Sequence, residues 1–165
     1  MPWNAYRFVE HWNIPARPEV VWDVLADGTL LPLWWRGVYL ESVPLGAYAG
    51  PAVGNRHRAK ARGFLPYRLR FELESLALER PRLVKVGVRG DLTGTWTATL
   101  SPTAAGTRVD IEQVVTADKP LLRWFSPLLK PLFAWNHRWT TPRGEQGLTA
   151  YLAERKEGAL PRDAC

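Results

Sequence analysis

The sequence predicts an α+β fold in which a curved antiparallel sheet wraps round one long C-terminal helix. Three observations lead to this prediction. Strand-like alternation runs from residue 55 to 116, a strand and a short helix precede it, and a single aromatic-rich helix follows it. A sheet of this kind buries one face and leaves the other in water. We therefore expect a cavity between sheet and helix, lined by the inward-facing side chains.

The first part of the chain is expected to form a strand, a helix, a second short helix and a second strand, over Tyr6–Ile14, Pro18–Ala26, Leu30–Trp35 and Val38–Val43. Alternation in the first strand sets Phe8, Glu10 and Trp12 on one side. Pro18 suits the first position of a helix because its missing N–H would be unpaired there anyway. Gly28, which follows an aspartate, ends that helix.

Strands of the central meander show which face is buried. The alternating residues from Asn55 to Arg62 set four basic side chains opposite His57, Ala59 and Ala61. Acidic side chains of the following strand would meet those basic ones across a hairpin in water. The parity of the apolar residues then changes near Ser75, which indicates a β-bulge. Turns are expected at Gly63–Pro66, Asp91–Gly94 and Thr103–Gly106.

The last third predicts a helix from about Pro131 to Glu154, with a kink at Pro142. Gly144 and Gly147 each cost a helix roughly 1 kcal/mol relative to Ala. Two such glycines three residues apart indicate that the helix backbone lies close against something bulky, such as the tryptophans of the short helices. We expect one domain over residues 1–156 and a disordered tail over 157–165.

Composition excludes several classes of function. The net charge of +6 comes with scattered arginines and with no dense basic run, so nucleic acid is not an expected partner. Cys165 is the only cysteine, and neither a signal peptide nor a membrane-spanning stretch is present in the sequence, which favours the cytoplasm. Three dispersed histidines without ligand spacing predict no metal site. No phosphate-binding loop or nucleophile motif is present, and no cofactor is expected.

Several stretches together resemble the START-like, or SRPBCC, superfamily of helix-grip proteins, in particular a bacterial subgroup labelled polyketide cyclase/dehydrase-like. They are Ile14–Ala16, Val21–Leu25, Leu65–Phe71, Gly90–Gly94, Trp135–His137 and Gly144–Leu148. The resemblance implies a seven-stranded sheet around the C-terminal helix and an internal cavity for lipids, polyketides or other hydrophobic molecules. Members range from carriers and sensors to cyclases, so the fold alone does not decide the function.

Strand parity and helix spacing then predict the residues that line the cavity. We expect the ligand to contact Phe8, Trp12, Ala59, Tyr67, Leu69, Phe71, Trp96, Ile111, Gln113, Asn136 and Thr140. Small residues facing large ones leave a void rather than a filled core. Asn136 or His137 supplies a polar group from the helix, and the sequence does not decide which of the two faces the cavity.

Three functions remain open from the sequence. The first is a non-enzymatic binding or carrier protein for a hydrophobic small molecule. The second is a cofactor-free cyclase or aromatase-like enzyme, with Glu10 and His57 as proton donor and acceptor and Tyr67 orienting a substrate oxygen. The third is a ligand-responsive sensor domain. Stable membrane insertion is not expected, and transient membrane contact by the mixed apolar and basic segment Leu121–Trp139 is a minority interpretation.

Overall fold

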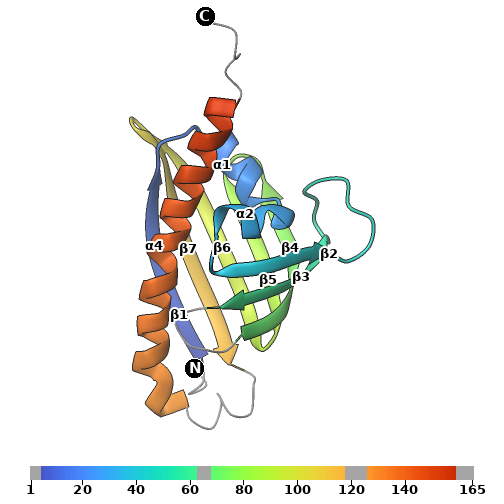
Figure 1. Cartoon of the computed structure of the whole chain (residues 1–165), viewed down its shortest axis with the longest axis vertical. Helices are drawn as coiled ribbons and strands as arrows, with labels where there is room; N and C mark the ends of the chain where they lie inside the picture. Colours follow the sequence, from blue (N-terminus) through green and yellow to red (C-terminus); the bar gives the residue numbers. More distant parts are fainter. Residues whose placement is uncertain (1–4, 63–67, 118–125, 159–165) are drawn as a thin grey trace, which may run out of the picture.

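A seven-stranded antiparallel sheet curves around helix α4 in the computed structural model, which describes residues 5–62, 68–117 and 126–158 (Figure 1). The strand order is β1-β7-β6-β5-β4-β3-β2. The first strand therefore pairs with the last, and the short helices that follow it lead the chain to the opposite edge of the sheet. The predicted helix-grip fold is confirmed.

The elements follow the predicted order. The strands are β1 Ala5–Ile14, β2 Tyr39–Pro44, β3 Arg56–Arg62, β4 Arg68–Glu79, β5 Leu83–Gly90, β6 Leu92–Thr103 and β7 Gly106–Ala117. The helices are α1 Pro18–Leu25, the 3-10 turn η1 Gly28–Leu30, α2 Leu31–Trp34 and α4 Ser126–Gly158.

Three boundaries differ from the prediction. The β5–β6 hairpin turns at Asp91 alone, because Leu92 already belongs to β6. Helix α4 begins at Ser126 and contains both Pro131 and Pro142, so neither proline ends it. It also runs to Gly158, four residues beyond the predicted helix end at Glu154. The rest of the predicted tail, residues 159–165, lies outside the described residues.

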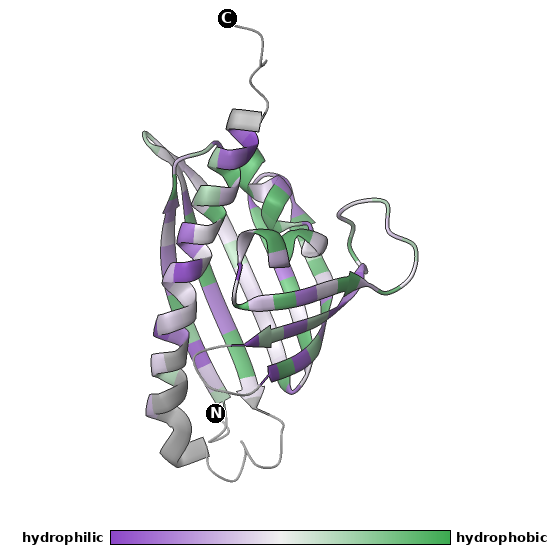
Figure 2. Ribbon diagram, in the orientation of Figure 1, coloured by the Kyte–Doolittle hydropathy of each residue, from purple (hydrophilic) through white to green (hydrophobic). Residues whose placement is uncertain are grey.

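The alternating pattern produces one apolar and one charged face, visible as bands along the strands (Figure 2). His57, Ala59 and Ala61 of β3 are buried. On the opposite face Arg56 forms an ion pair with Glu72 across the β3–β4 hairpin, as the charge pattern predicts. The predicted bulge is also present, because the β4–β5 register shifts between Ser75 and Ala77.

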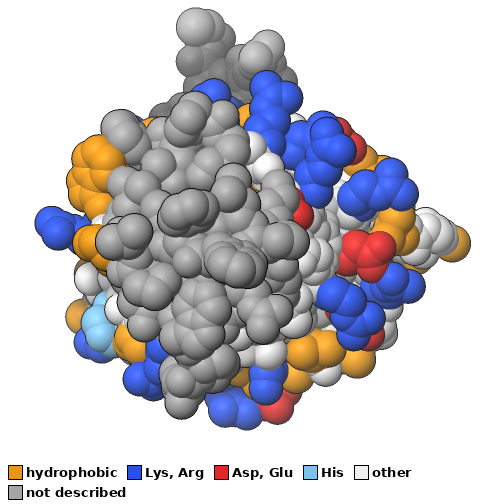
Figure 3. Space-filling model, turned by 90° about the horizontal axis from the view of Figure 1, so that it is seen from below, with side chains coloured by type: hydrophobic (Ala, Val, Ile, Leu, Met, Phe, Trp, Pro, Cys, Tyr) orange, Lys and Arg blue, Asp and Glu red, His pale blue; other side chains and the backbone are white. Residues whose placement is uncertain are grey.

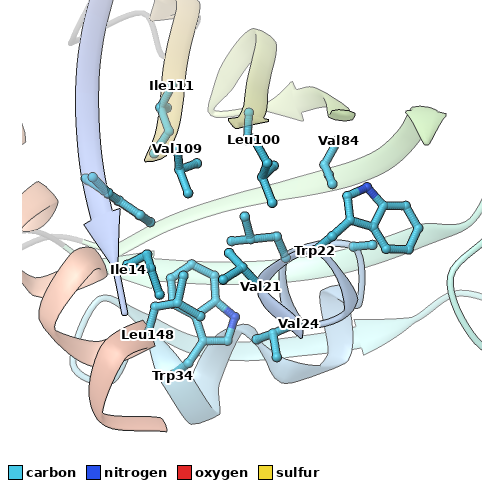
Figure 4. Packing of buried hydrophobic residues seen from close by; sticks show 14 of the residues in the cluster. Ile14, Val21, Trp22, Val24, Trp34, Val84, Leu100, Val109, Ile111 and Leu148 are labelled. Atoms are coloured by element: carbon cyan, nitrogen blue, oxygen red, sulfur yellow. The ribbon is translucent and has the colours of Figure 1, made fainter. Parts of the chain in front are cut away.

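The main core lies where α1, α2 and the C-terminal part of α4 meet the sheet (Figure 4). Val21 and Val24 of α1 and Leu148 of α4 are completely buried there. A Pro at the start of α1 and an acidic residue in its first turn favour this helix locally. A smaller cluster, formed by Ala59, Ala61, Phe71, Leu73 and Val88, continues the apolar face toward β3.

Helix α4 lies against α2 at the two glycines. A Cβ added to Gly144 would stand 2.7 Å from the Trp12 ring and 2.8 Å from the Trp35 ring. A Cβ added to Gly147 would overlap the carbonyl oxygen of Trp34. The Trp35 indole Nε1 also donates a hydrogen bond to the Thr140 carbonyl at 3.1 Å. The predicted close approach of these glycines to the tryptophans of a short helix is thus present.

Gly147→Ala should lower the free energy of unfolding by about 1–3 kcal/mol, because the added methyl overlaps a backbone carbonyl that cannot rotate away. Helix propensity alone would act in the other direction, by up to about 1 kcal/mol. Urea unfolding followed by circular dichroism measures the difference. Gln146→Ala, at an exposed position between the two glycines, is the matched control and should leave stability within about 0.5 kcal/mol. A Gly147→Ala protein as stable as the wild type would contradict the close packing.

Candidate functional site

A pocket opens between the concave face of the sheet and the η1–α2 segment. Its volume is about 70 Å³ as bounded by the described residues. The wall is largely apolar, with polar side chains from β3, β4 and β7. The lining residues are Leu25, Ala26, Gly28, Leu31, Trp34, Trp35, Tyr39, His57, Phe71, Leu73, Ser75, Val86, Val88, Leu92, Trp96 and Gln113. An apolar pocket with few polar groups is the usual form of a small-molecule site.

His57 is held tightly in this wall. Its ring lies so close to Gly28 that a Cβ there would come within 3.0 Å of it. The Tyr48 ring meets it edge-on from the other side, with ring centroids 5.3 Å apart. Tyr48 is itself anchored, because its hydroxyl donates to Asp27 Oδ1 at 2.6 Å. Burial lowers the pKa of His57, against the opposing charge of Asp27, and favours the neutral imidazole.

Two lining residues carry ring nitrogens that lack partners. Nε2 of His57 and Nε1 of Trp34 are buried and make no hydrogen bond within the described part of the chain. The residues themselves are only 4% and 1% exposed. Buried polar groups are nearly always paired in native proteins, since an unpaired one costs roughly 1–3 kcal/mol. These two nitrogens are therefore the groups of the pocket wall that a bound molecule could satisfy.

A second polar cluster lies where β1 passes under α4. Thr141 donates a hydrogen bond to Oε1 of Glu10 at 2.5 Å. Nε2 of His137 contacts the same oxygen, and the His137 ring stacks on Phe8 with centroids 3.9 Å apart. His137 and Thr141 are four residues apart and so share one face of the helix. The side chains of His137 and Glu10 are 19% and 14% exposed.

Burial sets the protonation of this pair. It raises the pKa of the Glu10 carboxyl, while hydrogen bonds from Thr141 and Trp12 act in the opposite direction. It lowers the pKa of His137 to about 4. At neutral pH the imidazole is therefore uncharged, and its Nε2–H tautomer can donate a hydrogen bond to Oε1 of Glu10. The cluster is then a buried carboxylate that accepts two hydrogen bonds from the helix.

The structure separates the two residues that the sequence suggested as an acid–base pair. Glu10 is on β1, at one edge of the sheet, and contacts α4. His57 is on β3, five places along the strand order, and packs against Gly28 and Tyr48. Both face the concave side, as strand parity predicts. The imidazole that contacts Glu10 belongs instead to His137, and Tyr67 lies outside the described residues.

Three of the eleven expected ligand contacts border the pocket: Phe71, Trp96 and Gln113. Trp12, Ala59 and Ile111 are buried in the two core clusters. Leu69 packs at the edge of the smaller cluster, and Phe8 stacks on His137. Thr140 donates its hydroxyl to the His137 carbonyl. The Asn136 side chain and Tyr67 lie outside the described residues. As a set of ligand contacts, these residues remain a prediction.

The alternation of side chains along the strands could not predict the part of the pocket wall that η1 and α2 contribute. Gly28, Leu31 and Trp34 line the pocket although the sequence indicates only a short helix there. His137 was one of two alternatives from the sequence and Thr141 was not predicted, but a signal for both exists. Residues 137, 141, 144 and 148 lie on one helical stripe, and Gly144 and Leu148 mark its buried side.

A larger groove, of about 1110 Å³, lies elsewhere. It is an open hollow between the β1–α1 corner, the β6–β7 turn and the last turns of α4. It contains none of His57, Gln113, Glu10 or His137. Its size reflects an open surface between three elements, so we place the candidate site in the smaller pocket, where partly buried polar groups face an apolar wall.

Comparison with known proteins agrees with this architecture. Residues 6–140 match the family described as "Polyketide cyclase / dehydrase and lipid transport". The match covers most of the chain, so the protein belongs to this family. None of the curated proteins compared matches the chain. No helix in the described ranges is both long and apolar enough to cross a membrane.

Solved structures with the same fold come from distant proteins. TTHA0849 from Thermus thermophilus is 21% identical, with a TM-score of 0.67, covering 94% of this chain and 98% of that one. Protein CV1439 from Chromobacterium violaceum is 19% identical, with a TM-score of 0.61 and coverages of 88% and 96%. A norcoclaurine synthase point mutant from Thalictrum flavum, solved with a transition state analogue, is 15% identical, with a TM-score of 0.60 and coverages of 92% and 96%. At these identities the likeness establishes the fold.

The stability of the protein should depend on pH through His137. Its pKa is near 6.5 in the unfolded chain and about 4 in the folded protein, so between these values the unfolded state binds the extra proton. Stability contributed by this group is full above pH 6.5 and is lost as pH falls toward 4, by up to about 3 kcal/mol. We expect the free energy of unfolding of the wild type, relative to His137→Gln, to decrease over this range.

Urea unfolding of both proteins at pH 7, 6, 5 and 4 measures this difference. His57 and Glu10 remain in both proteins, and the glutamine keeps an N–H that can reach Glu10. Glu10, with its raised pKa, acts with the opposite sign, because the folded state holds its proton longer. A wild-type advantage that grows on acidification would instead show a charged imidazolium–carboxylate pair.

Proposed function

We propose that the protein binds a hydrophobic small molecule, such as a lipid, polyketide or aromatic compound, between its sheet and the η1–α2 segment, as a binding or carrier protein. The observation that carries this proposal is the apolar pocket with two buried, unpartnered ring nitrogens, on His57 and Trp34. Family membership supports it, because the family description includes lipid transport. Apolar walls supply the affinity, and the few polar groups orient the ligand.

The pocket must widen to take such a ligand. At about 70 Å³ it has room for about two water molecules, each of which occupies ~30 Å³ in the liquid. The wall formed by η1 and α2 consists of two very short helices with few hydrogen bonds within them. Trp34 and Trp35 at its end pack against α4, so widening has to begin at η1 and the start of α2. Movement of this wall would expose the apolar surface of β4–β6. The ligand would then cover this apolar surface in place of the side chains of the wall.

A cyclase-like enzyme is the second candidate, and the contact between Glu10 and His137 favours it. A buried carboxylate with a raised pKa next to a neutral imidazole can take up and return a proton. The pair differs from the Glu10 and His57 pair suggested by the sequence, since His57 has no contact with Glu10. Turnover of a poly-β-ketone that is lost in Glu10→Gln and retained in Glu112→Gln would support this candidate.

Purified protein should carry a hydrophobic molecule, detected by native mass spectrometry and identified after solvent extraction. Protein stripped of it should bind the neutral fluorescent probe N-phenyl-1-naphthylamine. Val88→Phe fills the pocket with a larger side chain and should weaken binding of this probe at least tenfold. Val43→Phe is the control, because Val43 is exposed on β2, and should not change the affinity. Equal affinity for both variants, or no binding by the wild type, would overturn the proposed function.

A further inference from the structure

Glu10 is the only carboxylate or other charged group on the concave face of the described sheet. From Glu10 the cross-strand register runs through Ile111, Ala98 and Val84 to Leu78, all uncharged. The adjacent row begins at Phe8 and runs through Gln113, Trp96 and Val86 to Ser75. Lysine and arginine side chains lie on the outer surface, as the view from below shows (Figure 3). The inner face is thus neutral apart from one carboxylate.

Glu10 stands next to the pocket. Phe8 is two residues away on the same face of β1, and its Cα partner on β7 is Gln113, which lines the pocket. Residues paired across antiparallel strands have side chains about 5 Å apart. Glu10 is therefore one strand away from Gln113 of the pocket and two residues further along that strand. A chain-like ligand that passes Gln113 along this face reaches Phe8, His137 and Glu10.

The cluster can accept one more hydrogen bond. Both helix contacts, from Thr141 and from His137, are made to Oε1 of Glu10. The Trp12 side chain, on the same face of β1, also acts on Glu10 as a hydrogen-bond donor. A carboxylate can accept about four hydrogen bonds, so room for one more remains beside Thr141, His137 and Trp12. The described helix side chains at this point, His137 and Thr141, supply no positive charge that would neutralise the carboxylate. Its charge acts in a site shielded from water, where like charges repel strongly.

We infer that Glu10, with His137 and Thr141, forms the subsite for the polar end of the ligand, and that this end is a hydrogen-bond donor. The inference rests on the proposed function. The cavity then selects long-chain molecules that end in a hydroxyl or ammonium group, whose hydrogen bond the Glu10 carboxylate accepts. It rejects molecules that end in a carboxylate, although the net charge of the protein, +6, would attract them.

Competition between three matched probes tests this selection. Dodecylamine, 1-dodecanol and dodecanoate share one chain and differ only in the polar end. At pH 7.5 each is titrated against protein carrying N-phenyl-1-naphthylamine. We expect the amine and the alcohol to bind at least tenfold more tightly than dodecanoate, a difference of about 1.4 kcal/mol. Glu10→Gln keeps the shape of the side chain and removes its charge, so the difference should fall below threefold.

Glu112→Gln is the matched control. Glu112 lies on the neighbouring strand β7, on the outer face, where it pairs with Arg7. The same change of charge there should leave the tenfold preference intact. The wild-type ranking is decisive by itself if Glu10→Gln does not fold.

The outcomes separate this inference from the proposed function. Binding of the naphthylamine probe with equal affinities for the three chains, or with dodecanoate the tightest, would overturn the donor subsite and leave the proposed function standing. Failure of the naphthylamine probe to bind would overturn both. A preference that persists in Glu10→Gln would also overturn the inference, because another group would then be the acceptor.

Discussion

Helix α4 occupies its place only because positions 144 and 147 have no side chain. At Gly144 the helix backbone meets the rings of Trp12 and Trp35, and at Gly147 it meets the backbone of Trp34. The helix thereby touches both β1 and α2, which the chain connects through α1. Leu148, next to Gly147, is fully buried in the core. This contact fixes the height and the rotation of α4 over the sheet.

That rotation determines which polar groups face inward. Thr141 and His137 lie on the stripe that continues through Gly144 and Leu148, about one and two turns away from the glycine contact respectively. With the glycines seated on the tryptophans, this stripe points at β1, and both side chains reach Glu10. The polar cluster is thus a consequence of apolar packing elsewhere on the same helix. The hydrogen bond from Trp35 to the Thr140 carbonyl strengthens the same contact between α4 and α2.

The concave face contains two polar centres with different surroundings. His57 is enclosed by Gly28 and Tyr48 and has an unpartnered nitrogen. Glu10 is satisfied in part by the helix and lies at the opposite edge of the sheet. Four strands with largely apolar inner faces lie between them. At this separation the two groups are too far apart to exchange a proton directly.

The sequence by itself determined the strands, their inner and outer faces, the bulge after Ser75 and the role of the two helix glycines. These features follow from local steric and solvation preferences: alternate side chains of a strand point to opposite faces, and a glycine in a helix marks a close approach. The inward direction of the Glu10 and His57 side chains is also such a local feature, because the alternation along each strand decides it. The choice between Asn136 and His137 was left open, because both lie close to the helical stripe that Gly144 marks.

Only the tertiary structure decided which inward residues meet. Parity says nothing about strand order, and the pairing of β1 with β7 sets Glu10 beside α4 and far from His57. The wall formed by Gly28, Leu31 and Trp34 has the same origin, because it depends on how the β1–β2 connection folds over the sheet. The volume of the pocket depends on the sum of many side-chain contacts between distant segments. Such contacts are set by three-dimensional packing, which no local pattern in the chain records.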